Sequence, residues 1–357
     1  MRKLASRTIA YRPIANPAFV SDCLAVVLGV LSLSALRRHR RAFIRQLVAY
    51  VLSAALLPAA HLAWRLAYYG TWAPNAVFAK AFGLPPGAAK TGLSYLVGFV
   101  TAPPYLLPQA IVAAVYGLRR KESPTVLWTL LSACLSYAAM ISWVGGDHMP
   151  AHRLLLPLIP LSALALSFGI APSLRGVGWK PASLIVVALG LLLSLQLRRE
   201  PLHKDPAAFI GTIVGRHIAD RWPAGTLIAS NNAGSLPYFA DRYRYIDMLG
   251  LNDAHIGRRK ISRIRLPSQR APGHAKGDGE YVLARDPQII ILGPPEGTHL
   301  SQPWFLSDLE LAESPGFRDR YRFRVLEIDV RGYPGYRDHS AARNGRLLFV
   351  YYERNPS

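Results

Sequence analysis

The residues best suited to chemistry lie in one short stretch between two apolar segments, Trp143–Pro160 (WVGGDHMPAHRLLLPLIP). It carries a carboxylate, two imidazoles and a guanidinium, at Asp147, His148, His152 and Arg153. Ionisable groups at the edge of a membrane are costly unless they are paired or face an aqueous cavity, so this cluster is a candidate functional site. A solvated hairpin whose charges only cap two helices is the competing interpretation.

Asp147 is the residue of this cluster that we predict to be catalytic, as a general base for a hydroxyl group or as a metal ligand. His148 and His152 are four residues apart, a spacing that suits two metal ligands on one face of a helix. Pro150 lies between them and disfavours a helix. A divalent metal held by the loop is therefore one alternative, and the sequence leaves the cofactor unknown.

Two cations of the N-terminal half, Lys80 and Arg153, could bind the phosphate of a lipid-linked donor. A guanidinium is well suited to bidentate contacts with phosphate. An enzyme that faces the outside of the cell has no ATP, so it needs a donor that is delivered within or across the bilayer. Both side chains could instead only extend their charged ends to the membrane interface.

Aromatic and amide side chains alternate in the stretch 68–80, which holds Tyr69 and Asn75. Stacked aromatic rings beside an amide are suited to binding the face of a sugar, and Tyr69 and Asn75 are the predicted sugar contacts. Aromatic residues also form belts at the membrane interface in most membrane proteins, and the composition of this stretch fits that interpretation as well.

The elements that must position these residues are apolar segments long enough to span a membrane. Six are predicted, at residues 18–36, 43–64, within 93–118, 125–144, 154–172 and 182–197. The predicted fold class is thus an α-helical multi-span membrane domain of about six helices, residues 1–197, followed by a small soluble α/β domain, residues 198–357. The charge changes at the same point, because residues 1–197 hold 18 Lys and Arg but only three acids.

Basic loops predict the orientation of the chain. The loops 37–45, 119–121 and 175–180 fall at alternate ends of the predicted spans, and such loops face the cytoplasm. The Asp147 loop and the C-terminal domain then lie outside an inner (plasma) membrane. Because the positive charge lies mainly beside apolar segments, membrane orientation explains it better than nucleic-acid binding. The basic N-terminus does not fit this orientation.

The C-terminal domain is predicted to be a mixed or parallel α/β domain. Residues 205–222 have helical spacing, with Asp205 as the N-cap. Short apolar or alternating runs predict five strands, at residues 226–230, 243–248, 288–292, 323–330 and 347–352. The loop after the first strand, 231–238, and the stretch 247–253 should lie close together, because the carboxyl ends of strands gather at one edge. Residues 257–280 are predicted to be a long loop, either a binding loop or disordered.

Four stretches of the chain resemble segments of polytopic glycosyltransferases of the GT-C type. In the N-terminal half these are Arg65–Lys80 (RLAYYGTWAPNAVFAK) and Gly145–Pro157 (GGDHMPAHRLLLP). In the C-terminal half they are Asn232–Asp253 (NAGSLPYFADRYRYIDMLGLND) and Gly273–Gly279 (GHAKGDG). The group includes terminal arabinofuranosyltransferases of actinobacterial cell walls and relatives of unknown substrate. The resemblance covers most of residues 60–350.

This resemblance implies a polyprenyl-phosphate sugar donor, inverting transfer and an active site that faces the periplasm. It also implies that polar residues of the two C-terminal segments contact substrate, namely Asn232, Asp247, Asp253, His274, Lys276 and Asp278. His148 and His152 are included among the substrate contacts. Members of the group are similar in carrying an acidic catalytic residue in a first outer loop, whereas Asp22 lies within the first apolar segment here. The chain is therefore expected to be the C-terminal part of a family member.

The function expected from the sequence is a membrane glycosyltransferase, or the C-terminal part of one. It would transfer a sugar from a lipid-linked donor to an envelope glycan acceptor. The alternative is a non-catalytic, membrane-anchored envelope protein whose tail binds a glycan or another partner. An upstream reading frame that encodes an acidic outer loop would favour the enzyme.

Overall fold

The protein is described from a computed structural model, which defines residues 40–83, 88–101, 106–121, 123–147, 150–170, 173, 205–333 and 342–356. Contacts between residues divide the chain into two compact units. Unit 1 comprises Met1–Trp72, Gly92–Gly146 and Ala151–Leu202. Unit 2 comprises Ala73–Thr91, Asp147–Pro150 and His203–Ser357. Two short segments of the N-terminal half thus fold with the C-terminal domain.

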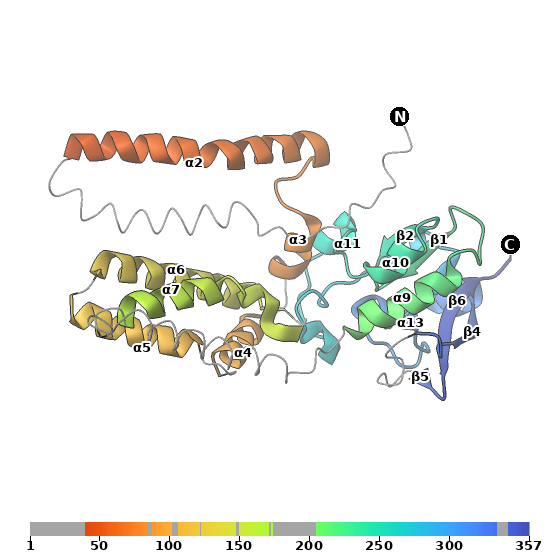
Figure 1. The fold of residues 1–357 in the computed structure, drawn as a ribbon. Helices are drawn as coiled ribbons and strands as arrows, with labels where there is room; N and C mark the ends of the chain where they lie inside the picture. Colours follow the sequence, from red (N-terminus) through yellow and green to blue (C-terminus); the bar gives the residue numbers. More distant parts are fainter. Residues whose placement is uncertain are drawn as a thin grey trace. The chain divides into compact units, whose positions relative to one another are not determined.

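The secondary structure of unit 1 is all helical in its described residues (Figure 1). Its elements are α2 (Arg40–Tyr69), α4 (Ala88–Thr101, which begins in unit 2), α5 (Leu106–Arg119), α6 (Pro124–Trp143), the 3-10 helix η1 (Pro150–Leu155) and α7 (Leu158–Ile170). Helices α5, α6 and α7 pack on one another. The backbones of α5 and α7 approach closely, because a Cβ atom added to Gly169 would lie 2.2 Å from the carbonyl oxygen of Ala113.

The predicted six-span membrane domain is wrong for the described residues. Only two helices there are long and apolar enough to cross a membrane, Val51–Tyr69 within α2 and Pro124–Trp143, which is α6. The segment predicted within 93–118 forms two helices of 14 residues each, and the segment predicted at 154–172 forms η1 and the 13-residue α7. These helices are shorter than the roughly 20 residues that a span requires. The segments predicted at 18–36 and 182–197 lie outside the described residues.

The two long apolar helices differ in how much surface they bury. Only 6% of the apolar window in α2 is buried, against 44% in α6. Leucine side chains of α2 are widely exposed, with Leu56 at 68% and Leu57 at 76%. Water is a poor solvent for such a surface, and lipid is a good one. On the location of the protein, the structure shows that two helices of the described residues have the length and composition of membrane spans.

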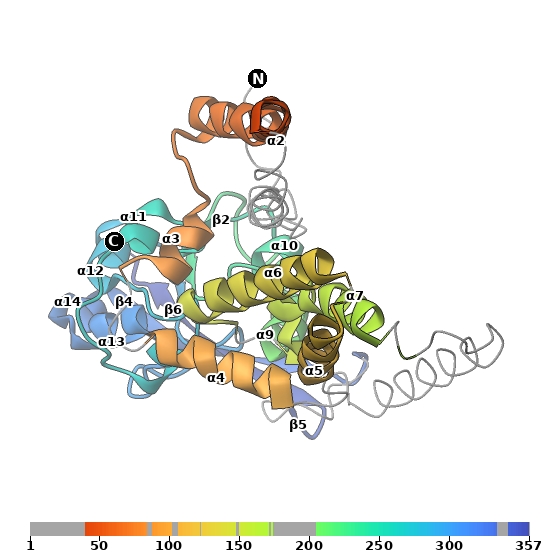
Figure 2. The same ribbon diagram turned by 90° about the vertical axis from the view of Figure 1, so that its left-hand side faces the viewer.

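Unit 2 is an α/β unit built on one mixed sheet. Its strands are β1 (Leu227–Ser230), β2 (Arg244–Asp247), β3 (Ile289–Ile291), β4 (Tyr321–Asp329), β5 (Ala342–Arg343) and β6 (Arg346–Arg354). Its helices are α3 (Asn75–Ala81), α9 (Pro206–Ile218), α10 (Ser235–Phe239), α11 (Ala254–Arg258), the 3-10 helix η3 (Pro267–Arg270), α12 (Gly279–Ala284), α13 (Leu306–Glu313) and α14 (Pro315–Arg320). Figure 2 shows α3, α11 and α12 in one region of this unit.

The sheet has the order β2-β1-β3-β6-β4, and β5 pairs with β6. Strands β2, β1 and β3 are parallel, whereas β6 runs antiparallel to β3 and β4. Ser230 pairs with Asp247 at the carboxyl ends of β1 and β2. The chain after β1 and the stretch after β2 therefore begin side by side, which confirms the predicted proximity of residues 231–238 and 247–253. The predicted loop 231–238 ends at Gly234, because α10 begins at Ser235.

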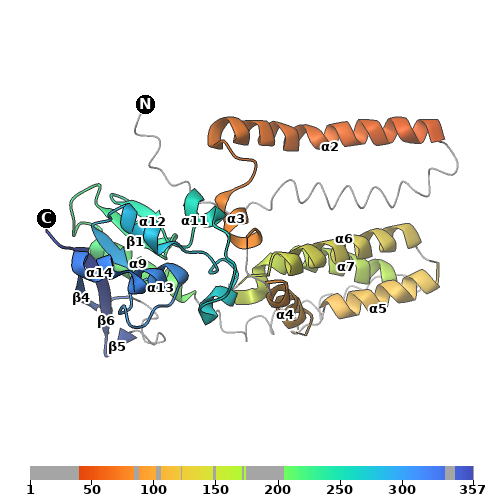
Figure 3. The same cartoon turned by 180° about the vertical axis from the view of Figure 1, so that it is seen from behind.

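Alternate strand residues face two hydrophobic cores. Ile228 and Ile289 join the core that is covered by α9 and α10. Ala229 and Ile290, one residue further along, join the core that includes residues of α11, α12, α13 and α14. The two layers can be followed from opposite sides in Figures 1 and 3. Successive side chains of a strand point to opposite faces of the sheet. Both faces of the central strands are apolar, so each face can contribute to one core.

The predicted elements of the C-terminal domain are present. The predicted helix at 205–222 is α9, and the Asp205 carboxylate accepts a hydrogen bond of 2.9 Å from the amide of Ala207, as an N-cap does. The five predicted strands correspond to β1, β2, β3, β4 and β6. The predicted loop 257–280 is mainly irregular, and the side chain of Gln269, which is 3% exposed, accepts bonds from the amides of Arg265 and Leu266. The predicted boundary near residue 198 lies outside the described residues.

Asp308 provides a test of this fold. Its buried carboxylate accepts hydrogen bonds from the side chain of Asn231 and from the amides of Gly293, Trp304 and Phe305. It thereby joins α13 to the ends of β1 and β3. Burial raises the pKa of Asp308 from 3.8 to about 6, and hydrogen bonds to the charged form oppose the rise.

The pKa of Asp308 is higher in the folded state than in the unfolded state. Its contribution to the free energy of unfolding is therefore complete below pH 3.8 and is lost as the pH rises through 6. We expect the opening free energy of β1 amides to fall by roughly 1–3 kcal/mol between pH 4 and pH 6.5. Hydrogen exchange of the β1 amides, corrected for the pH dependence of the intrinsic exchange rate, measures this opening free energy. The variant Asp308→Asn should show a shallower pH dependence. Equal slopes in the two proteins would contradict the account.

Candidate functional site around α3

Helix α3 is the part of the N-terminal half that packs within unit 2. It lies beside α11 in Figures 1 and 2, and the two helices are in contact. The side-chain amide of Asn75 donates a 3.2 Å hydrogen bond to the carbonyl oxygen of Asn252. The guanidinium of Arg258 lies 4.9 Å from the centre of the Phe78 ring, which is cation–π distance. Segments that are far apart in the sequence thus meet at α3.

Lys80, in the last turn of α3, forms an ion pair with Asp147. The distance from the Lys80 Nζ to an Asp147 carboxylate oxygen is 3.9 Å. The Asp147 side chain has no exposed surface, whereas that of Lys80 is 31% exposed. The pair therefore keeps the carboxylate buried and leaves part of the Lys80 side chain exposed. Burying a carboxylate is tolerable when a cation and hydrogen bonds offset its lost hydration.

Gly273 makes room for the Lys80 side chain. Its φ of +84° lies in the region that favours glycine, and an added Cβ would stand 3.1 Å from the Cε of Lys80. The next residue, His274, is half-buried and its ring meets that of Phe305 edge-on, with centroids 5.2 Å apart. The structure therefore brings the GHAKGDG segment against α3 through Gly273.

Lys276 fixes the chain that follows α3. It is fully buried, and its ammonium donates to the carbonyl oxygens of Phe82 at 2.8 Å, Gly83 at 3.1 Å and Arg259. The amide of Ile261 also donates to the Gly83 carbonyl, at 3.0 Å. Burial lowers the pKa of Lys276 to about 8, so the group is mainly protonated at neutral pH. Lys276 was predicted to bind substrate, and in the structure its three protein acceptors give it a positioning role.

We name Lys80, Asp147, Gly273 and Lys276 the α3 site. All four belong to unit 2. Within it, Lys80 is the cation with exposed surface, and the other three residues hold it or its helix in place. An exposed, positioned ammonium group can bind a phosphate or carboxylate.

Asp247 and Asp253 shape the turn that receives α3. The Asp247 carboxylate accepts bonds from the amides of Leu249 at 3.0 Å and Asn252 at 2.7 Å. Burial raises its pKa to about 6, which these hydrogen bonds oppose. Asp253 caps α11 through the amide of Ile256 and accepts a bond from the Tyr281 hydroxyl. Both predicted substrate contacts thus have protein partners that fix the loop.

Asn232 and Asp278 also act within the fold. The side-chain oxygen of Asn232 accepts bonds from the amides of Gly234 and Leu236 at the start of α10. One oxygen of Asp278 caps α12 at the amide of Tyr281, and the other lies 3.0 Å from the His255 ring nitrogen Nε2. These residues were predicted to bind substrate. The structure places Asp278 beside His255 and leaves Asn232 at a helix start.

The sequence analysis did not single out His255, whose ring stacks on Tyr281 with centroids 4.1 Å apart. It also did not find Arg259, which forms an ion pair with Glu310 at 2.8 Å and lies 3.7 Å from Asp278. No local pattern marks these residues, because their partners are up to 51 positions away. Only the packing of α11, α12 and α13 brings them together.

Tyr69, His152 and Arg153 belong to unit 1 and are described within it. Tyr69 ends α2, with the Arg65 guanidinium 5.3 Å from its ring centre and the Tyr68 ring edge-on at 4.7 Å. Arg153 lies in η1 and is exposed. Tyr69 thus belongs to an aromatic cluster at the end of α2 that covers the buried Arg65.

His152 packs in unit 1 against Tyr95 and Phe99, with ring centroids 5.0 and 6.1 Å away. Burial lowers its pKa, which favours the neutral ring. Its predicted partner in a metal site, His148, lies outside the described residues. Among the residues that the structure defines, no group of three His, Cys, Asp or Glu side chains could hold a metal ion.

Comparison with known proteins gives one match. Residues 203–336, which lie within unit 2, match a family described as a domain of unknown function, DUF8728. Neither the curated proteins nor the solved structures contain a match to the chain. The matched range includes β1, β2, β3 and β4 with their helices, together with the residues that receive α3.

Replacing Lys276 tests how the α3 site is held. Lys276→Met keeps the apolar stem and removes the ammonium group, which leaves three carbonyl groups without this donor. We expect a loss of roughly 2–5 kcal/mol in local stability, the cost of unsatisfied buried polar groups. The exchange rate of the Ile261 amide, which donates to Gly83, should rise strongly.

The matched control is Lys260→Met, which removes an exposed lysine from the same loop. It should leave the Ile261 amide protected. Equal protection in wild-type protein and the Lys276→Met variant would show that the ammonium group does not hold the segment after α3.

Proposed function

We propose that this chain is a membrane-bound glycosyltransferase, or the C-terminal part of one, that moves a sugar from a polyprenyl-phosphate carrier to a cell-envelope glycan. One observation carries the proposal: parts of all four segments that resemble GT-C enzymes meet within unit 2. Asn75 and Lys80 come from the first segment, Asp147 from the second, Asn252 from the third and Gly273 from the fourth.

Lys80 is proposed to bind the phosphate of the carrier. In the reaction, the acceptor hydroxyl attacks the anomeric carbon, the bond from that carbon to the phosphate oxygen breaks, and polyprenyl phosphate leaves. The hydroxyl proton passes to a base or to the departing phosphate. Negative charge grows on the departing phosphate, and a positioned ammonium group stabilises it. The 31% exposure of the Lys80 side chain leaves it accessible, and Gly273 and Asp147 limit where it can move.

Asp147 has two proposed parts in this reaction. As a general base it would take the hydroxyl proton, but its side chain has no exposed surface in this structure. As the counter-ion of Lys80 it needs no contact with the acceptor. Burial favours the second part, because a base must come within hydrogen-bond reach of the proton that it accepts.

A membrane location would suit a lipid-linked donor. Helix α6 follows Arg119, Arg120 and Lys121, so it starts beside basic residues. It ends shortly before Asp147, which belongs to unit 2. If α6 crosses a plasma membrane with its basic end in the cytoplasm, unit 2 lies outside the cytoplasm.

Variants of the ion pair test the function. Membranes that contain wild-type protein are incubated with radiolabelled polyprenyl-phosphate sugars and an envelope glycan, and incorporation is measured. We expect Lys80→Met to lower transfer about 10- to 100-fold, the effect of losing a charged contact to phosphate. Asp147→Asn should raise KM for the donor with a smaller change in kcat.

Lys260→Met serves as the control for loss of one exposed lysine and should leave transfer unchanged. A fall in kcat of about 100-fold in Asp147→Asn with KM unchanged would assign the base role instead. Equal transfer by wild type and Lys80→Met would refute the phosphate contact. The absence of transfer by wild-type membranes would contradict the proposed activity and favour the non-catalytic envelope protein.

Reporter fusions test the proposed orientation. A fusion at Arg120, before α6, should be active only with a cytoplasmic reporter, and a fusion after Ser357 only with an extracytoplasmic reporter. The reason is the basic sequence before α6. A cytoplasmic signal after Ser357 would place unit 2 in the cytoplasm. It could not then reach lipid-linked sugars on the outer face of the membrane, and the proposal would be contradicted.

A further inference from the structure

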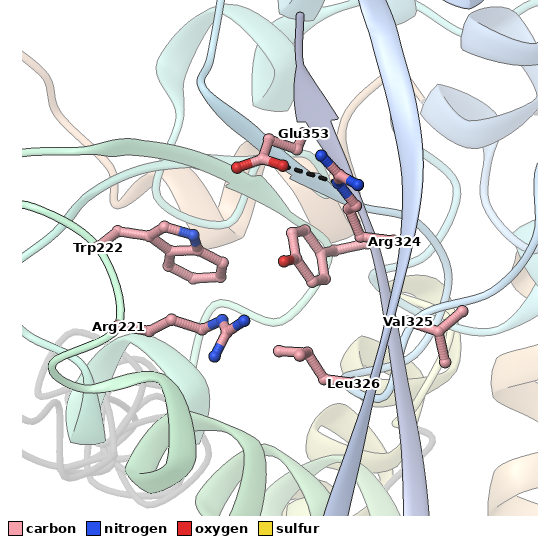
Figure 4. Close-up of a pocket in the computed structure, with 7 residues that line it drawn as sticks. Arg221, Trp222, Arg324, Val325, Leu326 and Glu353 are labelled. Atoms are coloured by element: carbon pink, nitrogen blue, oxygen red, sulfur yellow. Dashed lines mark hydrogen bonds and ion pairs between the residues drawn. The ribbon is translucent and has the colours of Figure 1, made fainter.

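A second candidate site lies on the sheet of unit 2, and it shares no residue with the α3 site. It is an open pocket of about 540 Å³. It is lined by Arg221, Trp222, Arg324, Val325, Leu326, Tyr351 and Glu353 (Figure 4). The volume is within the usual range of small-molecule sites, roughly 300–1,000 Å³.

The floor of the pocket follows from the pairing of β4 with β6. Arg324 pairs with Tyr351, and Leu326 stands two residues further along β4 on the same face. Glu353 lies on that face as well, two residues after Tyr351. An aromatic ring, an aliphatic side chain and two charged groups therefore share one side of the sheet.

The wall of the pocket comes from the chain that follows α9. The amide of Trp222 donates a 2.9 Å hydrogen bond to the Tyr243 hydroxyl, which fixes the backbone at this point. The indole ring meets the Tyr351 ring edge-on, with centroids 5.4 Å apart and an interplanar angle of 73°. Trp222 is only partly buried, so a flat apolar surface remains open to a ligand.

The charges of the pocket do not balance. Glu353 is already engaged, because its carboxylate accepts a 2.8 Å hydrogen bond from the Arg324 guanidinium (Figure 4). Arg221 has no carboxylate partner among the residues that the structure defines. Its guanidinium lies between Trp222 and Leu326 in Figure 4. The pocket thus holds two cations and one carboxylate, and one cation is available to an anion.

We propose that this pocket binds one anionic sugar residue, a ring that carries a carboxylate or a phosphate. The Trp222 ring offers an apolar surface for the C–H face of the sugar. Arg221 is suited to the anionic group, since a guanidinium forms paired hydrogen bonds with carboxylate and phosphate. Arg324 and Glu353 supply a donor and an acceptor for ring hydroxyls. The proposal does not depend on glycosyl transfer at the α3 site.

Calorimetric titration of the detergent-solubilised full chain tests it, with D-glucuronate, glucose 6-phosphate, glucose and inorganic phosphate as probes. We expect at least one anionic sugar to bind at millimolar concentration or better, about tenfold more tightly than glucose. Whichever anionic sugar binds identifies the anion. Arg221→Gln should remove this preference, and Arg285→Gln, which changes an exposed arginine outside the pocket, should not.

Variants of Trp222 test the apolar wall. Trp222→Leu should weaken the binding of every sugar about tenfold, and Trp222→Phe should retain most of it because an aromatic face remains. Equal binding of glucose and both anionic sugars, or an unchanged preference in Arg221→Gln, would overturn the role of Arg221. Phosphate binding as tightly as glucose 6-phosphate would overturn the sugar site, as would failure of both anionic sugars to bind at millimolar concentration.

Discussion

The interaction on which the α3 site depends is the burial of the Lys276 ammonium group. Removing an ammonium ion from water costs far more than a single hydrogen bond returns, so the group must be surrounded by acceptors. Three backbone carbonyl groups supply them, two after α3 and one at Arg259. Backbone acceptors cannot move away without moving the chain. The charge therefore determines where the end of α3 lies within unit 2.

The same region shows how acidic side chains are used. Asp247, Asp253 and Asp278 accept hydrogen bonds from backbone amides at the turn and helix starts around α11 and α12. These bonds fix the turn and the helix starts against which α3 packs. Within the α3 site, the cation with exposed surface is Lys80. We infer that these acids build the site, and that Lys80 and Arg221 are the basic residues that bind anions.

Local patterns were sufficient to predict α9 and five strands of the C-terminal domain, but not its other helices or β5. Asp205 before an apolar helix and the isoleucine run of β3 each encode one element within a few residues. The contact between Lys276 and Phe82 joins residues 194 positions apart, and no local pattern reveals it. The six-span prediction failed because apolar length alone does not define a span. Pro103 and Pro104 lie in the interval between α4 and α5, and prolines disfavour a continuous helix there.

The central claim is that Lys80 and Asp147 act as one unit that binds the phosphate of a polyprenyl carrier. A double-mutant cycle of Lys80→Met and Asp147→Asn, measured as affinity for polyprenyl phosphate in nanodiscs, tests it most directly. If the carboxylate acts by positioning the ammonium group, the double variant should bind about as weakly as Lys80→Met alone. That corresponds to a coupling energy of roughly 0.5–3 kcal/mol. Strictly additive losses, or binding of polyprenyl phosphate no tighter than binding of polyprenol by wild-type protein, would contradict the account.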